Sequence, residues 1–408
     1  FRGGDYMRAN SVYLADYIIM HHYNIRQNTF IISPTGSGKT YYILDVLTPG
    51  HKCLYLCDNN NLKRSVLKHP NTVEYGVLNA SADVEVMTYK QFGKETIYRT
   101  RDFINEYDYV IADEVHNLID YSKFSNDTDL TRAIDALVQN YENTKIVFFT
   151  ATPYYLDCIK KDYPYFLNNF KVWDFSKVKE IKRYTNKRRA YISSMYQIKF
   201  VLEEYKEAFM YNNWKCLIYT PKVTDMHKIE QIVIDKGLNP ILIWSTSRTE
   251  EPMNNEQLIT NAQLIETGYL REPYNVLIIN RATETGVNIY DEDMNLVIVN
   301  TVNVTQQIQV RGRVRHDIDL IVLKDKDMSK VAKTIIIPPE LLDVQLSKET
   351  LEQFIKDYGL KDTKKKEFIT VNKFLSLIKD EYEVTKKKIR IDGKQVMSYK
   401  IQLKKNND

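Results

Sequence analysis

Short runs of consecutive apolar residues recur along the chain, and each is followed by a segment with helical spacing. Because the apolar residues are consecutive and do not alternate with polar ones, the runs predict strands buried on both faces of a parallel sheet. Strands that alternate with helices in this way predict doubly wound α/β units. The predicted strands fall within residues 28–33, 52–57, 84–89, 107–113, 145–152, 215–220, 240–245, 274–280 and 295–301.

The predicted strands form two groups, separated by a charged stretch at residues 163–190 that lacks the apolar runs. We interpret this stretch as a connector between two lobes, either a solvated linker or a contact for nucleic acid. A chain of 408 residues has room for two or three domains. The pattern therefore predicts a first domain over residues 1–175 and a second domain over residues 176–335.

A different pattern begins after Leu323 and predicts a small module over residues 336–408. Residues 370–384 have the spacing of a short amphipathic helix. Two alternating runs follow them and are joined by Asp392-Gly393, which is a strong signal for a hairpin turn. The predicted fold is thus α/β, with two tandem parallel-sheet domains and a C-terminal α+β, winged-helix-like module.

Much of the positive charge of the chain lies in this C-terminal module. Residues 361–408 hold fourteen Lys and Arg against seven Asp and Glu, whereas the whole chain has a formal net charge of only +4. A local basic surplus indicates a polyanionic partner such as nucleic acid, and a solvated basic surface is equally compatible with it. The candidate phosphate contacts on the predicted hairpin are Lys387, Lys388 and Arg390.

The remaining composition is that of a globular protein, with 43% hydrophobic and 27% charged residues. Four cysteines are too few and too scattered for a disulfide framework or a zinc cluster, so Cys53 and Cys57 are expected to be core thiols on one face of a strand. Few cysteines, no apolar stretch near the roughly 20 residues that cross a bilayer, and no signal-peptide pattern predict a cytoplasmic location. The chain starts at Phe1 rather than Met, so we expect a fragment or a processed chain.

A glycine-containing loop, Ser33-Pro34-Thr35-Gly36-Ser37-Gly38-Lys39-Thr40, lies between an apolar strand and a helical stretch at residues 41–47. Glycines at these positions let backbone N–H groups curl around a phosphate at a helix N-terminus. In this type of loop the lysine reaches the β- and γ-phosphates, and the following hydroxyl ligates Mg²⁺. Ser33 stands where the general motif has its first glycine. The loop predicts ATP binding by Pro34, Thr35, Gly36, Ser37, Gly38, Lys39 and Thr40.

Two adjacent carboxylates, Asp113 and Glu114, follow the apolar run of residues 107–112. Side chains at the carboxyl ends of parallel strands share one edge of the sheet, so these carboxylates are expected near the glycine-containing loop. An isolated Asp-Glu pair is also common as a helix N-cap. Beside a phosphate loop, Asp113 is expected to hold Mg²⁺ and Glu114 to polarise the attacking water.

Asp113-Glu114-Val115-His116 resembles the DExH box of superfamily 2 helicases, and residues 35–40 resemble their motif I. Thr150-Ala151-Thr152-Pro153, directly after an apolar run, resembles motif III. The resemblance implies two RecA-like domains that bind ATP and Mg²⁺. It also implies that His116 couples the ATP site to the hydroxyls of Thr150 and Thr152.

The second half of the chain carries two further matches to the same superfamily. Residues 281–289 resemble motif V, with Asn288 where many relatives have Asp. Residues 306–315 resemble motif VI, where Arg315 lies one position before the expected final arginine and His316 occupies its place. The resemblance implies ATP contacts from Gly286, Asn288, Gln309 and Arg313. Arg313 is the expected arginine finger from the facing lobe, with Arg315 as its partner.

Weaker matches, judged by position alone, predict contacts to the nucleic-acid backbone. They are Asn61 after the second strand, Thr88 and Tyr89 after the third, Thr220 at the place of motif IV, and Thr283 in motif V.

The sequence therefore predicts a helicase or translocase that couples ATP hydrolysis to movement on nucleic acid. The Tyr-, Lys-, Asn- and Ile-rich composition suggests an AT-rich phage or mobile element, which favours DNA over RNA. The expected setting is a monomer or a replication, repair or restriction assembly in the cytoplasm, that of the bacterial host if the chain is phage encoded. Two alternatives stay open: a P-loop ATPase that remodels protein, and the motor subunit of a restriction-type nuclease complex.

Overall fold

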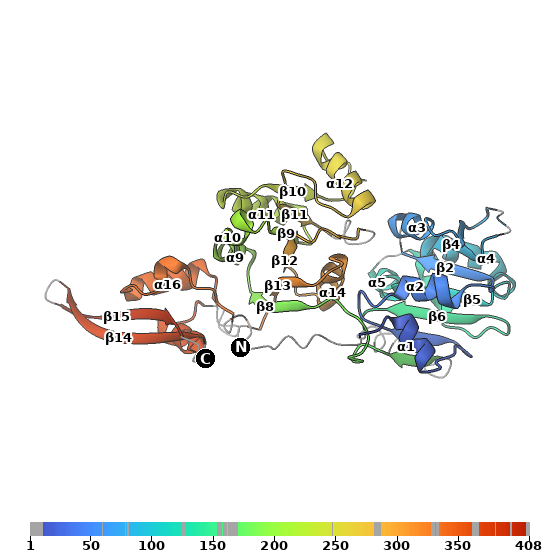
Figure 1. Cartoon of the computed structure of the whole chain (residues 1–408), viewed down its shortest axis with the longest axis horizontal. Coiled ribbons are helices and arrows are strands. Elements are labelled where there is room, and N and C mark those ends of the chain that lie inside the picture. The colour runs from blue at the N-terminus through green and yellow to red at the C-terminus, as the bar shows by residue number, and fades with distance from the viewer. Residues whose placement is uncertain are drawn as a thin grey trace. The chain divides into compact units, whose positions relative to one another are not determined.

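The computed structural model forms two compact units, residues 1–184 and residues 185–408, which are described separately (Figure 1). The described residues are 11–58, 60–77, 79, 81–124, 127–152, 157, 161, 170–246, 248–280, 287–327, 331, 334–360, 367–379, 381–391 and 394–404.

The first unit contains a seven-stranded parallel sheet in the order β3-β4-β2-β5-β6-β1-β7. Its strands are β1 (Thr29–Ile32), β2 (Cys53–Cys57), β3 (Thr72–Glu74), β4 (Val84–Thr88), β5 (Tyr109–Ala112), β6 (Lys145–Thr150) and β7 (Lys171–Asp174). Its helices are α1 (Leu14–Met20), α2 (Lys39–Tyr41), the π-helix η1 (Tyr42–Leu47), α3 (Asn60–Val66), α4 (Tyr89–Ile104), α5 (Val115–Phe124) and α6 (Thr128–Leu137).

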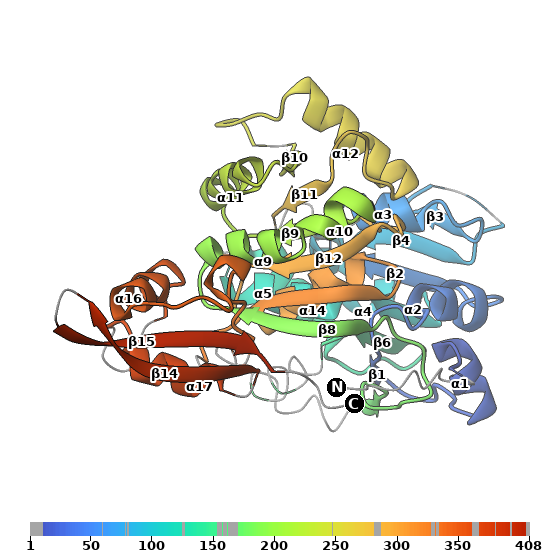
Figure 2. The same ribbon diagram turned by 60° about the vertical axis from the view of Figure 1, so that its left-hand side comes forward.

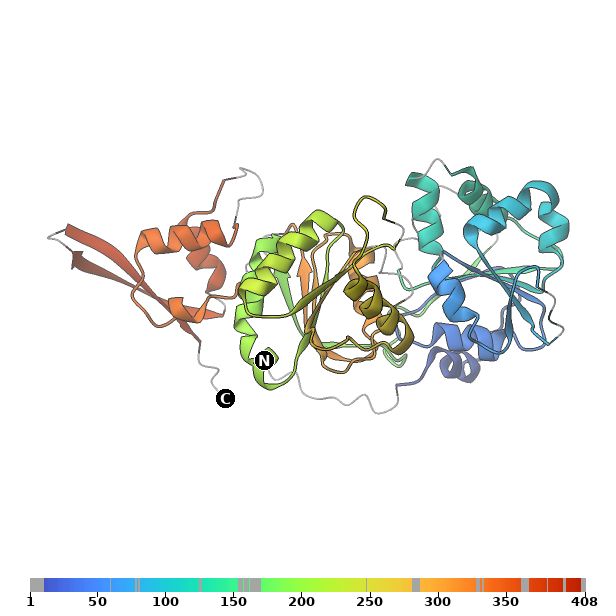
Figure 3. The ribbon, with the colours of Figure 1, turned by 90° about the horizontal axis from the view of Figure 1, so that it is seen from above.

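Both faces of this sheet are buried, as the apolar runs predict. On β2, Leu54 and Leu56 belong to one hydrophobic cluster, whereas Cys53, Tyr55 and Cys57 belong to a second. The two cysteines therefore lie on one face of a buried strand, and both are free thiols. Helices cover the sheet on both sides because each face must be removed from water (Figure 3).

The second unit contains a six-stranded parallel sheet in the order β10-β11-β9-β12-β13-β8. Its strands are β8 (Asn186–Ile192), β9 (Lys215–Tyr219), β10 (Pro240–Ile243), β11 (Val276–Ile279), β12 (Met294–Val299) and β13 (Ile318–Lys324). Its helices are η2 (Met195–Gln197), α9 (Ile198–Glu204), α10 (Lys206–Tyr211), α11 (Val223–Asp235), α12 (Asn255–Thr267) and α14 (Val304–Arg313). Side chains cap several of these helices, as in the capping box that Asn254 and Gln257 form at the start of α12.

The charged stretch at residues 163–190 joins the two units, whose boundary follows Tyr184, but it also contains strands that the prediction missed. Strand β7 pairs with β1 at one edge of the first sheet, and β8 begins within the stretch and pairs with β13 at the edge of the second. Edge strands tolerate exposed charge, and Lys187, Arg188 and Arg189 lie exposed on β8. A search for apolar runs therefore misses such strands. Strands β3 and β13 also lie outside the predicted runs.

The C-terminal module consists of η3 (Pro339–Leu341), α16 (Lys348–Asp357), α17 (Val371–Ile378) and an antiparallel hairpin of β14 (Tyr382–Ile391) and β15 (Lys394–Leu403) (Figure 2). The predicted helix and hairpin are confirmed, although the helix ends well before residue 384 because β14 starts at Tyr382. The predicted turn at Asp392-Gly393 lies outside the described residues. Module side chains form their own hydrophobic cluster, against which Tyr191 and Phe200 also pack.

Helices α4 and α6 pack so closely that a glycine is required between them. A Cβ atom on the buried Gly93 would overlap the backbone carbonyl of Asp129. In an open helix position, Gly→Ala stabilises by about 0.8–1.0 kcal/mol, whereas overpacking a core costs typically about 1–3 kcal/mol.

We therefore expect Gly93→Ala to lower the free energy of unfolding of the first unit by roughly 1–2 kcal/mol, because the overlap outweighs the gain in helix propensity. Urea unfolding followed by circular dichroism measures this difference. A variant that is more stable than the unsubstituted protein would show that the two helices can separate without cost.

Candidate functional site

The glycine-containing loop connects β1 to α2 and has the backbone of a phosphate-binding loop. Gly36 and Gly38 have φ angles of 78° and 88°, in the left-handed region that favours glycine. Ser33 is buried, its N–H donates to the Thr150 carbonyl at 3.0 Å, and its hydroxyl accepts from the Ser37 hydroxyl at 3.3 Å. Ser33, at the place of the motif's first glycine, thus ties the loop to itself and to β6.

Two tyrosines that carry no recognisable motif lie against this loop. A Cβ atom on Gly36 would overlap the Tyr184 ring, and one on Gly38 would lie 3.1 Å from Cδ1 of Tyr13. The segment around Tyr13 is fixed to the loop because the Leu14 N–H donates to the Ser37 carbonyl at 2.8 Å. The sequence offers no signal for this packing, since the residues are distant along the chain.

The loop leads directly into the helix that carries the two predicted phosphate and metal ligands. Lys39 is the first residue of α2 and is half-buried, whereas the Thr40 side chain is exposed. Pro34 and Thr35 are also half-buried. The structure therefore leaves the Lys39 and Thr40 side chains accessible at the start of the helix, where backbone N–H groups favour an anion.

Asp113 follows β5 and is held by hydrogen bonds on both carboxylate oxygens. The Tyr55 hydroxyl donates to Oδ2 at 2.5 Å, and the Glu114 N–H donates to Oδ1 at 3.0 Å. The Tyr89 hydroxyl donates to the Asp113 backbone carbonyl at 2.7 Å. Because Tyr55 lies on β2, next to β5 in the sheet, the strand register places its hydroxyl beside the carboxylate.

Burial and, to a smaller extent, the neighbouring Glu114 carboxylate raise the pKa of Asp113 to about 6. Hydrogen bonding from Tyr55 and the positive charge of Lys39 act in the opposite direction. The Asp113 side chain is only 5% exposed. A hard divalent cation such as Mg²⁺ fits this set, because it prefers oxygen ligands and would favour the ionised form of a carboxylate that burial disfavours.

A chain of close polar contacts runs from Glu114 to β6 through the fully buried His116. Nδ1 of His116 lies 3.3 Å from Oε2 of Glu114 and 3.0 Å from the Thr150 hydroxyl. The Thr150 hydroxyl also accepts from the Thr152 N–H at 3.0 Å. Glu114 itself has a φ of 49°, a left-handed conformation that is uncommon outside glycine and that directs the side chain from a tight turn. The structure therefore brings His116 to the Thr150 hydroxyl, whereas Thr152 reaches Thr150 through its backbone N–H and not through its hydroxyl.

In the second unit, backbone hydrogen bonds connect the last residue of the predicted motif V, Ile289, to the end of the predicted motif VI. The Ile289 N–H donates to the Arg313 carbonyl, and the Arg315 N–H donates to the Ile289 carbonyl, both at 2.8 Å. The Arg315 guanidinium donates to Oδ1 of Asn288 from Nε at 2.8 Å and from Nη2 at 2.5 Å. Gly286 and Thr283 lie outside the described residues.

Arg313, the expected arginine finger, is the last residue of α14 and is half-buried. No carboxylate among the described residues lies within ion-pair distance of it, and its Nε atom is buried without a hydrogen-bond partner there. Gln309 lies one turn earlier on the same helix and is also half-buried. His316, which stands at the place of the final motif arginine, contacts the backbone carbonyls of Asp291 and Asp317.

Two of the predicted nucleic-acid contacts are corrected by their burial. Tyr89 is 1% exposed and its hydroxyl donates to the Asp113 backbone carbonyl. Its side chain is therefore not accessible to a nucleic-acid strand. Thr220 is 0% exposed, and its hydroxyl accepts from the Asn300 amide at 3.1 Å. Thr88 is half-buried, and its hydroxyl accepts from the Gln91 N–H at the start of α4. For Asn61, only its place on α3 is described.

The basic residues of the hairpin are accessible. Lys387, Lys388 and Arg390 are all exposed on β14, where Lys388 and Arg390 share one face and Lys387 lies on the other. Lys386 is exposed as well, and its ammonium donates to Oδ1 of Asn372 at 3.3 Å.

Within the described ranges, no three His, Cys, Asp or Glu side chains are arranged to hold a metal ion. None of the helices in the described part of the chain combines the length and the apolar character that crossing a membrane requires.

Comparison with known proteins agrees with this geometry. Residues 8–155 match the family model described as "Type III restriction enzyme, res subunit". In fold, the chain is similar to S. cerevisiae Dbp5 bound to RNA and ADP BeF3, with a TM-score of 0.50 and 14% identity over 75% of this chain and 81% of Dbp5. The Escherichia coli DEAH/RHA helicase HrpB gives a TM-score of 0.50 and 15% identity over 87% of this chain, which spans about half (48%) of HrpB.

The fold is that of two tandem RecA-like domains. The family match covers the unit that contains the phosphate loop, the acidic pair and Thr150. No curated protein matches the chain at a significant level of sequence similarity.

The Tyr55–Asp113 hydrogen bond yields a test that depends on pH. We expect Tyr55→Phe to lower the free energy of unfolding of the first unit by about 1.5–3 kcal/mol at pH 8, the usual worth of a hydrogen bond to a charged group. At pH 5 the loss should be smaller. The reason is that Asp113, with a pKa raised to about 6, is then largely protonated and the bond is no longer charge-assisted.

Urea unfolding at the two pH values measures both losses, and Tyr42→Phe serves as the control. Tyr42 is a buried tyrosine of the same unit whose hydroxyl has no hydrogen-bond partner among the described residues. If Tyr55→Phe lowered the free energy of unfolding at pH 8 by no more than Tyr42→Phe does, the hydrogen bond to Asp113 would contribute nothing to stability.

Proposed function

We propose that this protein is an ATP-dependent motor that moves along nucleic acid or unwinds it. The observation that carries the proposal is the chain of contacts from Glu114 through His116 to Thr150, next to a loop with phosphate-binding geometry. A helix cap or a fortuitous turn would not require these three groups to meet. The tandem RecA-like fold and the match of residues 8–155 to the family of type III restriction enzyme res subunits support the same function.

In this proposal, the loop N–H groups, Lys39 and the start of α2 bind the ATP phosphates, and Thr40 and Asp113 hold Mg²⁺. When bound, Mg²⁺ neutralises charge on the phosphate oxygens. Tyr55 and the Glu114 N–H keep the Asp113 carboxylate in a fixed orientation. Glu114 orients the attacking water and takes up its proton, while His116 holds Glu114 and carries the change to Thr150.

Arg313 is our candidate for the arginine finger that stabilises the charge of the transferring phosphoryl group. Its guanidinium lacks a carboxylate partner among the described residues. This is expected of an arginine that binds an anionic ligand. Arg315 already donates twice to Asn288, so we assign Arg315 and Asn288 a supporting role, and we expect Gln309 of α14 to contact ATP as well. Arginine fingers contribute roughly 10³–10⁵ to the rate in enzymes where they have been measured.

The substrate that we propose is DNA rather than RNA. The support is the restriction-enzyme description of the matching family and the AT-rich character of the composition. The same family match favours one alternative role, the motor subunit of a restriction-type complex. The two roles differ in outcome: such a motor would move along duplex DNA without separating its strands, whereas a helicase would release a labelled strand.

Two substitutions separate nucleotide binding from hydrolysis. We expect Lys39→Ala to abolish both binding of a fluorescent ATP analogue and ATPase activity. Glu114→Gln should retain binding but slow hydrolysis by roughly 10²–10⁴-fold, the usual contribution of a general base. The measurements are steady-state ATPase rates with single-stranded DNA, duplex DNA and RNA, together with equilibrium binding of the analogue.

Glu142→Gln is the matched control, because Glu142 is an exposed carboxylate that precedes β6. It therefore lies at the amino ends of the strands, whereas Glu114 lies at their carboxyl ends. Unchanged turnover in Glu114→Gln would refute the role of Glu114. If neither DNA nor RNA raised the ATPase rate, the proposal of a motor on nucleic acid would be refuted. The protein would then be assigned only nucleotide hydrolysis.

The basic hairpin provides a separate test of the nucleic-acid contact. Replacing Lys387, Lys388 and Arg390 with Gln should weaken binding to duplex DNA. It should also reduce the slope of log K against log salt by up to about 0.9 for each phosphate contact that is lost. Fluorescence anisotropy over a series of salt concentrations measures both effects.

The control for this triple variant replaces the exposed Lys68, Lys171 and Lys177 of the first unit with Gln, which changes the net charge equally. A hairpin variant with the same salt slope as the unsubstituted protein would mean that β14 does not touch phosphate.

A further inference from the structure

Helix α12 flanks β10, the edge strand of the second sheet, and turns most of its apolar side chains outward (Figure 1). Leu258, Ile259 and Ile265 are between 42% and 52% exposed. By contrast, the polar side chains of Gln257 and Thr260 are buried. A surface helix normally buries its apolar stripe and exposes its polar face. The outward face of α12 is therefore available to another apolar surface.

Hydrogen bonds fix the orientation of α12. The Gln257 side-chain amide donates to the Leu242 carbonyl of β10 at 2.7 Å, and Gln257 also forms the capping box with Asn254. The Thr260 hydroxyl is buried without a hydrogen-bond partner among the described residues. Because burying such a group costs free energy, Thr260 does not explain why this side of the helix faces inward. The apolar side chains thus stay outward although the chain on its own gains nothing from their exposure.

The exposed apolar side chains form a continuous surface. Leu258, Ala262 and Ile265 are exposed and lie at i, i+4 and i+7, so they share one stripe of the helix. Gly268 follows Ile265 by three positions, and a Cβ atom on it would overlap the Tyr290 ring, which is half exposed. We call Leu258, Ile259, Ala262, Ile265 and Tyr290 the α12 patch. Contiguous exposed apolar surface of this kind marks an interaction site, whereas single exposed residues do not.

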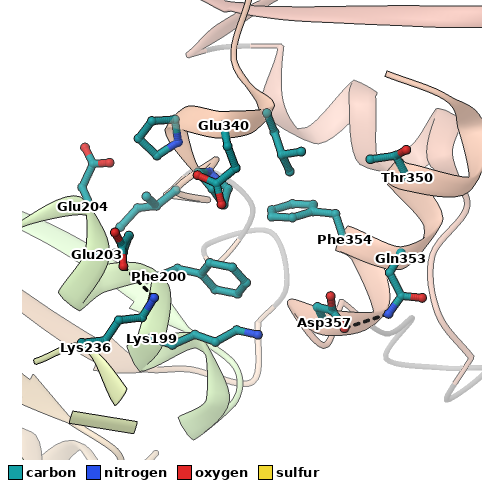
Figure 4. Close-up of a pocket in the computed structure, with 14 residues that line it drawn as sticks. Lys199, Phe200, Glu203, Glu204, Lys236, Glu340, Thr350, Gln353, Phe354 and Asp357 are labelled. Carbon is teal, nitrogen blue, oxygen red and sulfur yellow. Dashed lines mark hydrogen bonds and ion pairs between the residues drawn. The ribbon is translucent and has the colours of Figure 1, made fainter. Parts of the chain in front are cut away.

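A cavity elsewhere in the second unit differs from this patch because its groups already have partners. It measures about 840 Å³ and lies where α9 and η3 meet α16 (Figure 4). The Lys199 ammonium lies 4.7 Å from the centre of the Phe200 ring, and Lys236 is paired with Glu203 at 2.6 Å. These side chains are not free for a ligand.

Carboxylates border the α12 patch. Glu266 lies in the last turn of α12, and Glu292 and Asp293 closely follow Tyr290. All three residues are exposed, and none has an ion-pair partner among the described residues. The basic side chains of this region, Arg271 and Lys215, are already in ion pairs at 2.7 Å and 3.0 Å. The border of the patch is therefore negatively charged.

The extent and the charge of the patch select its ligand. The patch comprises five side chains, whereas a standard protein–protein interface uses about 20–30 residues on each side. It is thus too small for a stable contact with a second copy of the chain, which would also bring its own carboxylates. Nucleic acid is disfavoured by the same negative charges.

A basic amphipathic helix fits both properties. Its apolar stripe can lie along an apolar helix face, and the long stems of Lys and Arg can reach carboxylates at the border. We propose that the α12 patch binds a basic amphipathic helix of a partner protein. The apolar stripe of that helix lies on Leu258, Ala262 and Ile265, and its Lys or Arg side chains pair with Glu266 and Glu292.

The probe for this proposal is a synthetic, fluorescein-labelled 18-residue peptide. It has Leu at positions spaced i, i+3, i+4 and i+7 along a helix and Lys at the other positions. We expect saturable binding to the full chain, measured by fluorescence anisotropy. The double variant Leu258→Gln/Ile265→Gln should bind the peptide roughly tenfold more weakly, because two half-exposed apolar side chains no longer lose contact with water on binding.

The matched control is Ile19→Gln/Ile97→Gln, which removes two exposed isoleucines of α1 and α4 in the first unit. This control should bind the peptide as the unsubstituted protein does. A second arm tests the charges. Glu266→Gln/Glu292→Gln should weaken binding by about threefold, the loss expected for two exposed charge pairs. A peptide with Glu in place of every Lys should not bind.

Absence of saturable binding, equal binding of the Glu peptide, or equal weakening by Leu258→Gln/Ile265→Gln and its control would each overturn the proposal. Sedimentation velocity of the protein alone provides a further check. A dimer that forms with concentration and is lost in Leu258→Gln/Ile265→Gln would assign the patch to a second copy instead. None of these variants touches the phosphate loop or the acidic pair, so nucleic-acid-stimulated ATPase tests the proposed function independently.

Discussion

The loops that leave the carboxyl ends of neighbouring strands in the first sheet are hydrogen-bonded to one another, and this constraint positions the phosphate loop, the acidic pair and Thr150. Ser33 after β1 is bound to Thr150 at the end of β6, and Thr150 contacts His116 in the first turn of α5, the helix that follows β5. Tyr55 of β2 then holds the carboxylate of Asp113. The strand order β2-β5-β6-β1 makes each of these contacts one between adjacent strands. A parallel sheet is therefore sufficient to assemble residues that are more than one hundred positions apart.

Much of this arrangement could be predicted because consecutive apolar residues and their spacing specify buried parallel strands. The loop at Gly36, the pair Asp113 and Glu114, and Thr150 were all predicted at strand ends, and the structure places them there. The edge strands β7 and β8 could not be predicted in this way, because a strand with one exposed face carries the charge pattern of a linker. Sequence reasoning also treats a tyrosine in an apolar run as core. It cannot show that the Tyr55 hydroxyl meets a carboxylate, since that depends on the register between two strands.

The three arginines at the end of α14 illustrate the same limit. Arg311 is structural, because its guanidinium donates to Asn186 and to the backbone carbonyls of Thr185, Val314 and His316. Arg315 donates to Asn288, and Arg313 has no carboxylate partner among the described residues. A run of basic residues in a sequence does not distinguish these roles, whereas hydrogen-bond partners do. Because Asn288 is a neutral acceptor, it orients Arg315 without cancelling its positive charge, which an aspartate at that position would do.

The packing of Tyr184 on Gly36 has a mechanical consequence. Tyr184 is the last residue of the first unit, and the next residue, Thr185, begins the second. Its ring rests on the backbone of the phosphate loop, so a rearrangement of that loop displaces the point at which the chain leaves the first unit. The loop is thereby linked to the start of β8 through a single aromatic side chain and two peptide bonds. Any change in the backbone at Gly36 therefore meets the residue that directly precedes the junction between the units.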